Sequence, residues 1–208
     1  MGSRLPLVSI AVGALACGLA DGPSATLAVR VSPDGLAILD VTRMTFTAEV
    51  AGLSGEPTFT WDFGDGSTAR GATVTHVFHA SGAHPVTLVA VQGSRRMTAS
   101  VPMTVRSLDG RWERSEGLGP AGFPFSFPLV QRGNVLTAEI NSPSLCPSFS
   151  PSFSLPHGTI RGTVSHPRSV QWTLSCVGER EFTGEVHPEL DAITGGFVPN
   201  QRLTYLRR

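Results

Sequence analysis

Short stretches in which apolar and polar residues alternate run through most of the chain, and glycine, proline, serine and aspartate separate them. Alternation with a period of two predicts β-strands that bury one face, and the polar breaks predict turns. Strands of the length found between residues 26 and 106 cannot cover both faces of one sheet, so we expect two sheets packed face to face. The strands predicted in this region span residues 26–31, 41–50, 58–63, 73–78, 85–92 and 97–105.

A more specific signal lies at residues 61–66, which read Trp-Asp-Phe-Gly-Asp-Gly. The side chains of Phe59 and Trp61 share parity along a strand, so both are expected to point into the core. The two glycines suit a tight turn because glycine adopts positive φ at little cost, and aspartates brace such turns through their own backbone. We therefore expect structural roles for Trp61, Asp62, Phe63, Gly64, Asp65 and Gly66.

This string resembles the hallmark of the PKD domain, an immunoglobulin-like β-sandwich named for polycystin. The resemblance continues through Thr-His-Val-Phe at 75–78, the turn at 81–82 and Val-Thr-Leu at 86–88. It covers residues 26–106 and implies a module that contacts proteins or carbohydrates, or that acts as a spacer. Phe78 and His84 stand where the family more often has tyrosine.

The same region offers two metal alternatives. Asp62 and Asp65 could bind Ca²⁺, but two carboxylates fall short of its roughly 6–8 oxygen ligands. His79 and His84 could meet across a turn, and His76 lies nearby, but two ligands do not complete a zinc site. We favour the turn interpretation and expect neither a metal nor a cofactor.

The alternation continues from residue 109 to residue 208, where four strands share the order apolar–x–small–x–apolar. A small residue inside a strand lets a curved sheet bend or lets two backbones approach closely. With four further strands the region holds about eight, which suits an antiparallel meander closed into a barrel. The layout resembles lipocalin-like domains. The repeats lie at 136–140, 160–164, 182–186 and 193–197, and the other strands at 111–114, 124–131, 169–176 and 202–207. The fold class predicted for the chain is therefore all-β, a PKD sandwich at 26–106 followed by a barrel-like domain at 109–208.

Phenylalanines in the second region allow two interpretations. Residues 143–156 are rich in serine and proline and are expected to form a long loop, because proline cannot sit in a central strand. Phenylalanines of this loop and of an early strand could line an apolar ligand cavity, or they could fill the barrel core, which we prefer. These residues are Phe123, Phe125, Phe127, Phe149 and Phe153.

Residues 1–16 have the layout of a secretory signal peptide and are too short for a membrane span, which needs about 20 apolar residues. They end in Ala-Leu-Ala before Cys17, which resembles a bacterial lipobox with Cys17 as the acylated residue. Plain secretion and an uncleaved anchor are the alternatives. Residues 17–25 are expected to form a tether. Cys146 and Cys176 are expected to pair in a disulfide, which leaves Cys17 as the odd cysteine.

Charge and motif content exclude several function classes. The 16 basic and 16 acidic residues form no long run of one sign, so we expect no nucleic-acid partner and no membrane contact except through a lipid anchor. Common nucleophile, zinc, phosphate and calcium motifs are missing, so we expect no enzyme. The sequence favours an exported, lipid-anchored binding or scaffolding protein of the cell envelope, with an unidentified protein or carbohydrate partner. A carrier of a small apolar ligand in the barrel is the alternative, and an accessory protein of a separately encoded hydrolase is a third hypothesis.

Overall fold

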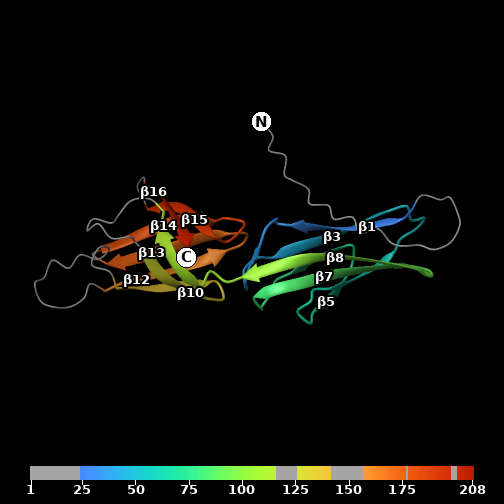
Figure 1. Ribbon diagram of the computed structural model, residues 1–208, viewed down its shortest axis with the longest axis horizontal. Helices are drawn as coiled ribbons and strands as arrows, with labels where there is room; N and C mark the ends of the chain where they lie inside the picture. The colour runs from blue at the N-terminus through green and yellow to red at the C-terminus, as the bar shows by residue number, and fades with distance from the viewer. Residues whose placement is uncertain (1–23, 116–125, 142–156, 177, 198–200) are drawn as a thin grey trace, which may run out of the picture. The chain divides into compact units, whose positions relative to one another are not determined.

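The computed structural model describes residues 24–115, 126–141, 157–176, 178–197 and 201–208. The regular secondary structure of these residues consists of β-strands alone, which confirms the all-β prediction. By packing, the chain divides into two compact units (Figure 1). The first comprises residues up to Asp34 together with Arg43–Thr104, and the second comprises Gly35–Thr42 together with Val105–Arg208.

The first unit is a sandwich of two sheets, as predicted. One sheet has the order β1-β3-β6, and the other runs β8-β7-β4-β5, with β2 paired in parallel to the end of β8. Side chains of one parity from both sheets form the core, among them Phe46, Trp61 and Leu88, which are fully buried. The strands of these two sheets are β1 (Thr26–Ser32), β2 (Ala37–Ile38), β3 (Met44–Ala51), β4 (Thr58–Asp62), β5 (Thr68–Arg70), β6 (Thr73–His76), β7 (Gly82–Gln92) and β8 (Arg95–Arg106), of which β2 and the last two residues of β8 belong to the second unit.

The second unit is a closed barrel of eight antiparallel strands, which confirms the predicted meander. Each strand pairs with the next along the chain, and the last strand pairs with the first. The strands are β9 (Gly110–Arg114), β10 (Ser126–Arg132), β11 (Val135–Asn141), β12 (His157–Ser165), β13 (Ser169–Cys176), β14 (Gly178–Val186), β15 (Ala192–Phe197) and β16 (Gln201–Arg207).

Aromatic side chains and glycines together shape the barrel interior. The rings of Trp172 and Phe182 stack 4.1 Å apart at an interplanar angle of 6°. Glycine makes room for this pair: a Cβ on Gly195 would lie 2.6 Å from Cζ of Phe182 and 2.2 Å from the carbonyl oxygen of Thr183. A Cβ on Gly162 would lie 2.4 Å from Cβ of Trp172. The prediction that small residues permit close backbone approach is confirmed at these positions.

A segment from the N-terminal half of the chain completes the core of the second unit. Ile38 is 1% exposed and belongs to the same apolar cluster as the barrel residues. The buried side chain of Gln131 fixes this arrangement, since its Oε1 accepts the N–H of Leu108 at 2.7 Å and its Nε2 donates to the carbonyl of Leu39 at 2.8 Å. Residues 35–42 stand between β1 and β3 in the sequence, but they pack with the second unit.

Candidate binding site in the first unit

The indole of Trp61 lies in the core and is fully shielded from solvent. Its Nε1 donates to the carbonyl oxygen of Gly71 at 2.8 Å, so the polar end of the ring is satisfied. The ring of Phe46 from the facing sheet lies 5.9 Å away. Trp61 therefore holds the two sheets together and fixes the backbone at Gly71, and it presents no surface to a ligand.

The turn after β4 is built as the sequence predicts. Oδ1 of Asp62 accepts the N–H of Gly64 at 2.9 Å, and Oδ1 of Asp65 accepts the N–H of Ser67 at 3.0 Å. Gly64 and Gly66 have φ values of 72° and 90°, which glycine adopts without strain. Both aspartates thus bond the backbone of their own turn.

A contact between Asp65 and His76 ties this turn to the opposite sheet. Oδ2 of Asp65 lies 2.6 Å from Nε2 of His76, whose ring stacks on Phe63 at 4.1 Å. Burial raises the pKa of the Asp65 carboxyl, but hydrogen bonds from Ser67 and His76 outweigh it and lower that pKa to about 2. The carboxylate is therefore held in its charged form.

Ser67, His76 and Asp65 resemble the residue types of a hydrolytic triad, but their geometry differs from one. Oγ of Ser67 lies 3.4 Å from Nε2 of His76, the same nitrogen that Asp65 contacts. In a triad the acid and the nucleophile bind opposite nitrogens of the imidazole. The Ser67 hydroxyl instead donates to Asp65, so the group stabilises the turn and activates no nucleophile.

The neighbouring histidine His84 is also engaged in structure. It is 7% exposed, its Nε2 donates to the carbonyl oxygen of Ala80 at 2.8 Å, and its ring stacks with Phe78 at 5.0 Å. No group of three or more histidine, cysteine or acidic side chains suited to a metal ion occurs among the described residues.

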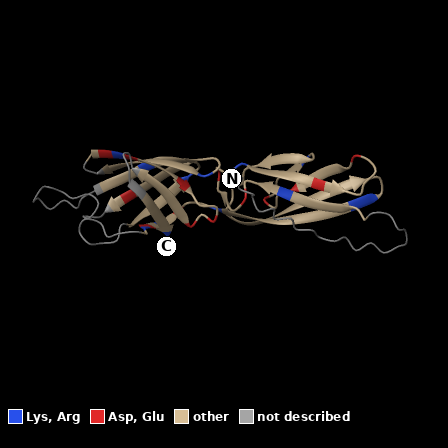
Figure 2. Ribbon diagram, turned by 90° about the horizontal axis from the view of Figure 1, so that it is seen from above, with Lys and Arg blue, Asp and Glu red and all other residues tan. Residues whose placement is uncertain are grey.

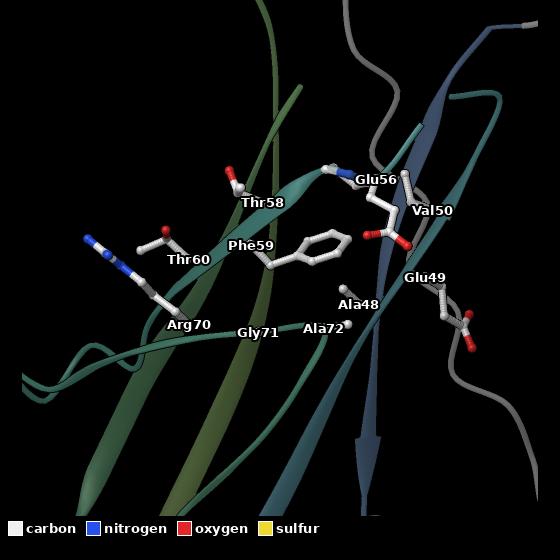
Figure 3. Close-up of a pocket in the computed structure, with 11 residues that line it drawn as sticks. Ala48, Glu49, Val50, Glu56, Thr58, Phe59, Thr60, Arg70, Gly71 and Ala72 are labelled. Atoms are coloured by element: carbon white, nitrogen blue, oxygen red, sulfur yellow. The ribbon is translucent and has the colours of Figure 1, made fainter. Parts of the chain in front are cut away.

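A groove of about 1030 Å³ opens at the other end of the sandwich (Figure 3). It forms because the pairing of β6 with β3 covers only Met44–Thr47, and the last bond on that edge joins the N–H of Ala48 to the carbonyl of Ala72. Beyond Ala48, β3 runs on to Ala51, and the facing sheets are no longer closed at this edge. The lining residues are Ala48, Glu49, Val50, Glu56, Pro57, Thr58, Phe59, Thr60, Arg70, Gly71 and Ala72.

Phe59 is the aromatic residue of this groove. Its side chain points between the sheets, as parity predicts, but it is only half-buried, in contrast to Trp61 two positions later. The expectation that Phe59 is a core residue like Trp61 is therefore corrected, because no strand covers it on the open side. The sequence signal that could have revealed this is Pro57, which marks the end of regular pairing in β4.

Only some of the predicted site residues of the second unit are among the described residues. Phe127 is 1% exposed and packs against Tyr205 at 5.4 Å, so it belongs to the core. Cys176 lies at the end of β13, but its side chain is not among those described, so its predicted bond to Cys146 is untested. Cys17, Cys146, Phe123, Phe125, Phe149 and Phe153 lie outside the described residues.

The described cleft of the second unit, of about 480 Å³, lies where the pairing of β10 with β11 ends at Val130 and Thr137. Buried residues Ala138 and Ile160 and exposed Glu139 line it. Ala138 and Ile160 belong to the same apolar cluster as Trp172 and Phe182, whose rings stack in the barrel interior.

Acidic and basic residues are interspersed along the strands of both units (Figure 2). Among the described residues no helix has the length and hydrophobicity needed to cross a membrane.

Comparison with known proteins assigns the first unit to a family. No curated protein matches the chain. A family model described as PKD domain matches residues 28–105. This match spans the sandwich, with the string from Trp61 to Gly66 inside it, and it indicates no catalytic family. Residues 28–105 are therefore a PKD domain, followed in the same chain by an eight-stranded antiparallel barrel.

Proposed function

We propose that this chain is an extracytoplasmic binding and scaffolding protein that contacts a protein or a carbohydrate through its PKD domain. PKD domains are immunoglobulin-like modules that are generally not catalytic. The observation that carries the proposal is the groove beside Phe59, since an incompletely buried aromatic ring in a concave surface is the usual anchor of a binding site.

Retention on immobilised proteins and polysaccharides of the envelope tests the role of the groove. Phe59→Ala is expected to lose most of the retention that the unchanged chain shows. Val135→Ala is the matched control, because Val135 is an apolar side chain that is 46% exposed and lies in the other unit. Equal retention of both variants would overturn the proposal.

We also propose that residues 1–16 direct export and that Cys17 is acylated, with residues 17–25 as the tether. The support is the arrangement of Arg4, the apolar stretch and the Ala-Leu-Ala-Cys sequence. The intact mass of the mature protein reports the cleavage site, any acyl chains and the Cys146–Cys176 bond together. Cys17→Ala is expected to release the protein from membranes, and a variant that stays membrane-bound would contradict the anchor.

The carrier hypothesis receives no support from the described part of the barrel. Five aromatic side chains are buried in its interior, and four of them form ring contacts with one another: Phe127, Trp172, Phe182 and Tyr205, with Trp112 as the fifth buried residue. An apolar fluorescent dye is accordingly expected to show no saturable binding to the folded chain.

A further inference from the structure

We propose that the groove of the PKD domain binds an extended polypeptide by adding it as a strand to the free edge of β3, with an apolar side chain on Phe59 and a basic side chain on Glu56. This inference rests on the proposed function of the groove, and it names the class of partner.

The backbone of β3 has hydrogen-bonding groups on its free edge. Along an antiparallel strand, the N–H and C=O of every second residue point to the same edge. Since the N–H of Ala48 reaches Ala72 in the direction of β6, the N–H and C=O of Val50 point the same way. The ladder to β6 stops at Thr47, and no described bond reaches Val50 on this edge. Val50 therefore offers one donor and one acceptor to an incoming strand.

The opposite wall of the groove offers fewer donors. The pairing of β4 with β5 spans Thr60 to Asp62, and the N–H of Gly71 then reaches the carbonyl of Phe59 at 3.2 Å. The next residue to face this edge is Pro57, which has no N–H to donate. A strand entering the groove thus meets a donor and an acceptor on one residue of β3, Val50, whereas Pro57 of the opposite wall offers an acceptor alone.

Side chains of the groove define what the strand must carry. Val50 and Phe59 project between the sheets, so the inward side chains of an added strand lie against the Phe59 ring (Figure 3). The carboxylate of Glu56 is directed toward this ring, whereas Arg70 points away from it. Glu49 already pairs with Arg30, so Glu56 is the acidic group of the groove with no described ion-pair partner. An apolar residue with a lysine or arginine two positions along the strand meets both requirements.

A polypeptide fits this site better than a glycan does. Strand addition uses main-chain hydrogen bonds for affinity and alternate side chains for specificity. An acceptor and a donor on one extended edge match a peptide backbone, and the single aromatic ring stands between two sheets and not on an open face where a sugar ring could stack.

The test uses the full chain and an array of synthetic octapeptides with threonine as the filler residue. In each peptide one position carries a varied apolar residue and a second position carries a varied charged residue. We expect the tightest binding for peptides with lysine or arginine two positions from the apolar residue. A copy of the array N-methylated at the edge-facing residues is expected to bind about tenfold more weakly, because a methyl group removes the donor. Equal binding of the methylated copy would overturn the inference.

Two variants complete the experiment. Val50→Pro removes the N–H on the free edge and leaves the pairing with β1 intact, so it should weaken binding of the best peptide about tenfold. Glu56→Gln should remove the preference for a basic residue and leave the fold unchanged. A Val50→Pro chain that binds as tightly as the unchanged protein would contradict strand addition. Retention on glycans through Phe59 without binding of any peptide would overturn this inference and keep the proposed function. If the chain binds neither glycans nor peptides through Phe59, this inference and the proposed function are both overturned.

Discussion

Replacing Trp61 tests how the PKD domain is held together. The side chain is fully buried, and an indole removes some 200 Å² from water, which at about 25 cal/mol per Å² is worth about 5 kcal/mol. Trp61→Ala also leaves the carbonyl of Gly71 without its donor. We expect the free energy of unfolding of the first unit to fall by about 3–5 kcal/mol, most of what such a domain has.

Trp61→Phe separates the two contributions. It keeps most of the apolar contact with Phe46 but removes the hydrogen bond to Gly71, so it should cost about 1–3 kcal/mol. Because Gly71 lines the groove, this variant should also weaken ligand binding more than its effect on stability explains.

Hydrogen exchange followed by mass spectrometry is the suitable assay. It measures the protection of amides in β4 and β7 separately from those of the barrel, whereas fluorescence would be dominated by Trp112 and Trp172 once Trp61 is removed. Amides of the barrel serve as the internal control. Unchanged protection of β4 and β7 in Trp61→Ala would refute the assignment of the indole to the core.

Three further predictions concern stability. Gly195→Ala should lower the melting temperature of the barrel, because the added Cβ would lie 2.2 Å from a carbonyl oxygen, and overpacking of this kind costs about 1–3 kcal/mol; a melt like that of the unchanged chain would contradict the close approach. Ile38→Ala should lower the free energy of unfolding of the second unit by about 2–5 kcal/mol, as exchange protection in β9–β16 would show, and an effect confined to the first unit would be inconsistent with the packing. The low pKa of Asp65 stabilises the folded state fully above its unfolded pKa near 4, and this contribution should be lost as pH falls toward 2, so urea unfolding of Asp65→Asn should depend less on pH in that window.

Alternation and turn residues predicted most of the architecture. The period of two located most strands of both units, because it depends on local backbone preferences and on which face is buried, but it did not predict the short strands β2 and β5. The barrel could be predicted because each strand pairs with its neighbour along the chain, so that topology follows from order.

Long-range packing was not predictable in the same way. Residues 35–42 look as apolar as any part of the sandwich, and their pattern does not specify that Ile38 packs with the barrel residues. The groove depends on where the pairing of β3 with β6 stops. That pairing stops where the chain passes from β5 to β6 through Gly71 and Ala72. The strand predicted at 73–78 ends at His76 in the structure, because Phe78 turns into the aromatic cluster with His84.

The two units differ in what they offer to another polypeptide. A closed barrel pairs its strands around the full circle and leaves no edge strand for a partner, and its core is filled by rings in contact. A sandwich keeps edges, and proteins ordinarily shield them with charge or proline. Here Pro57 shields β4, while β3 beyond Ala48 stays open beside a half-buried aromatic ring and an acidic group. Among the described residues, an edge without a paired strand thus lies beside an apolar ring and an acidic group, which is the arrangement that the proposed partner strand requires.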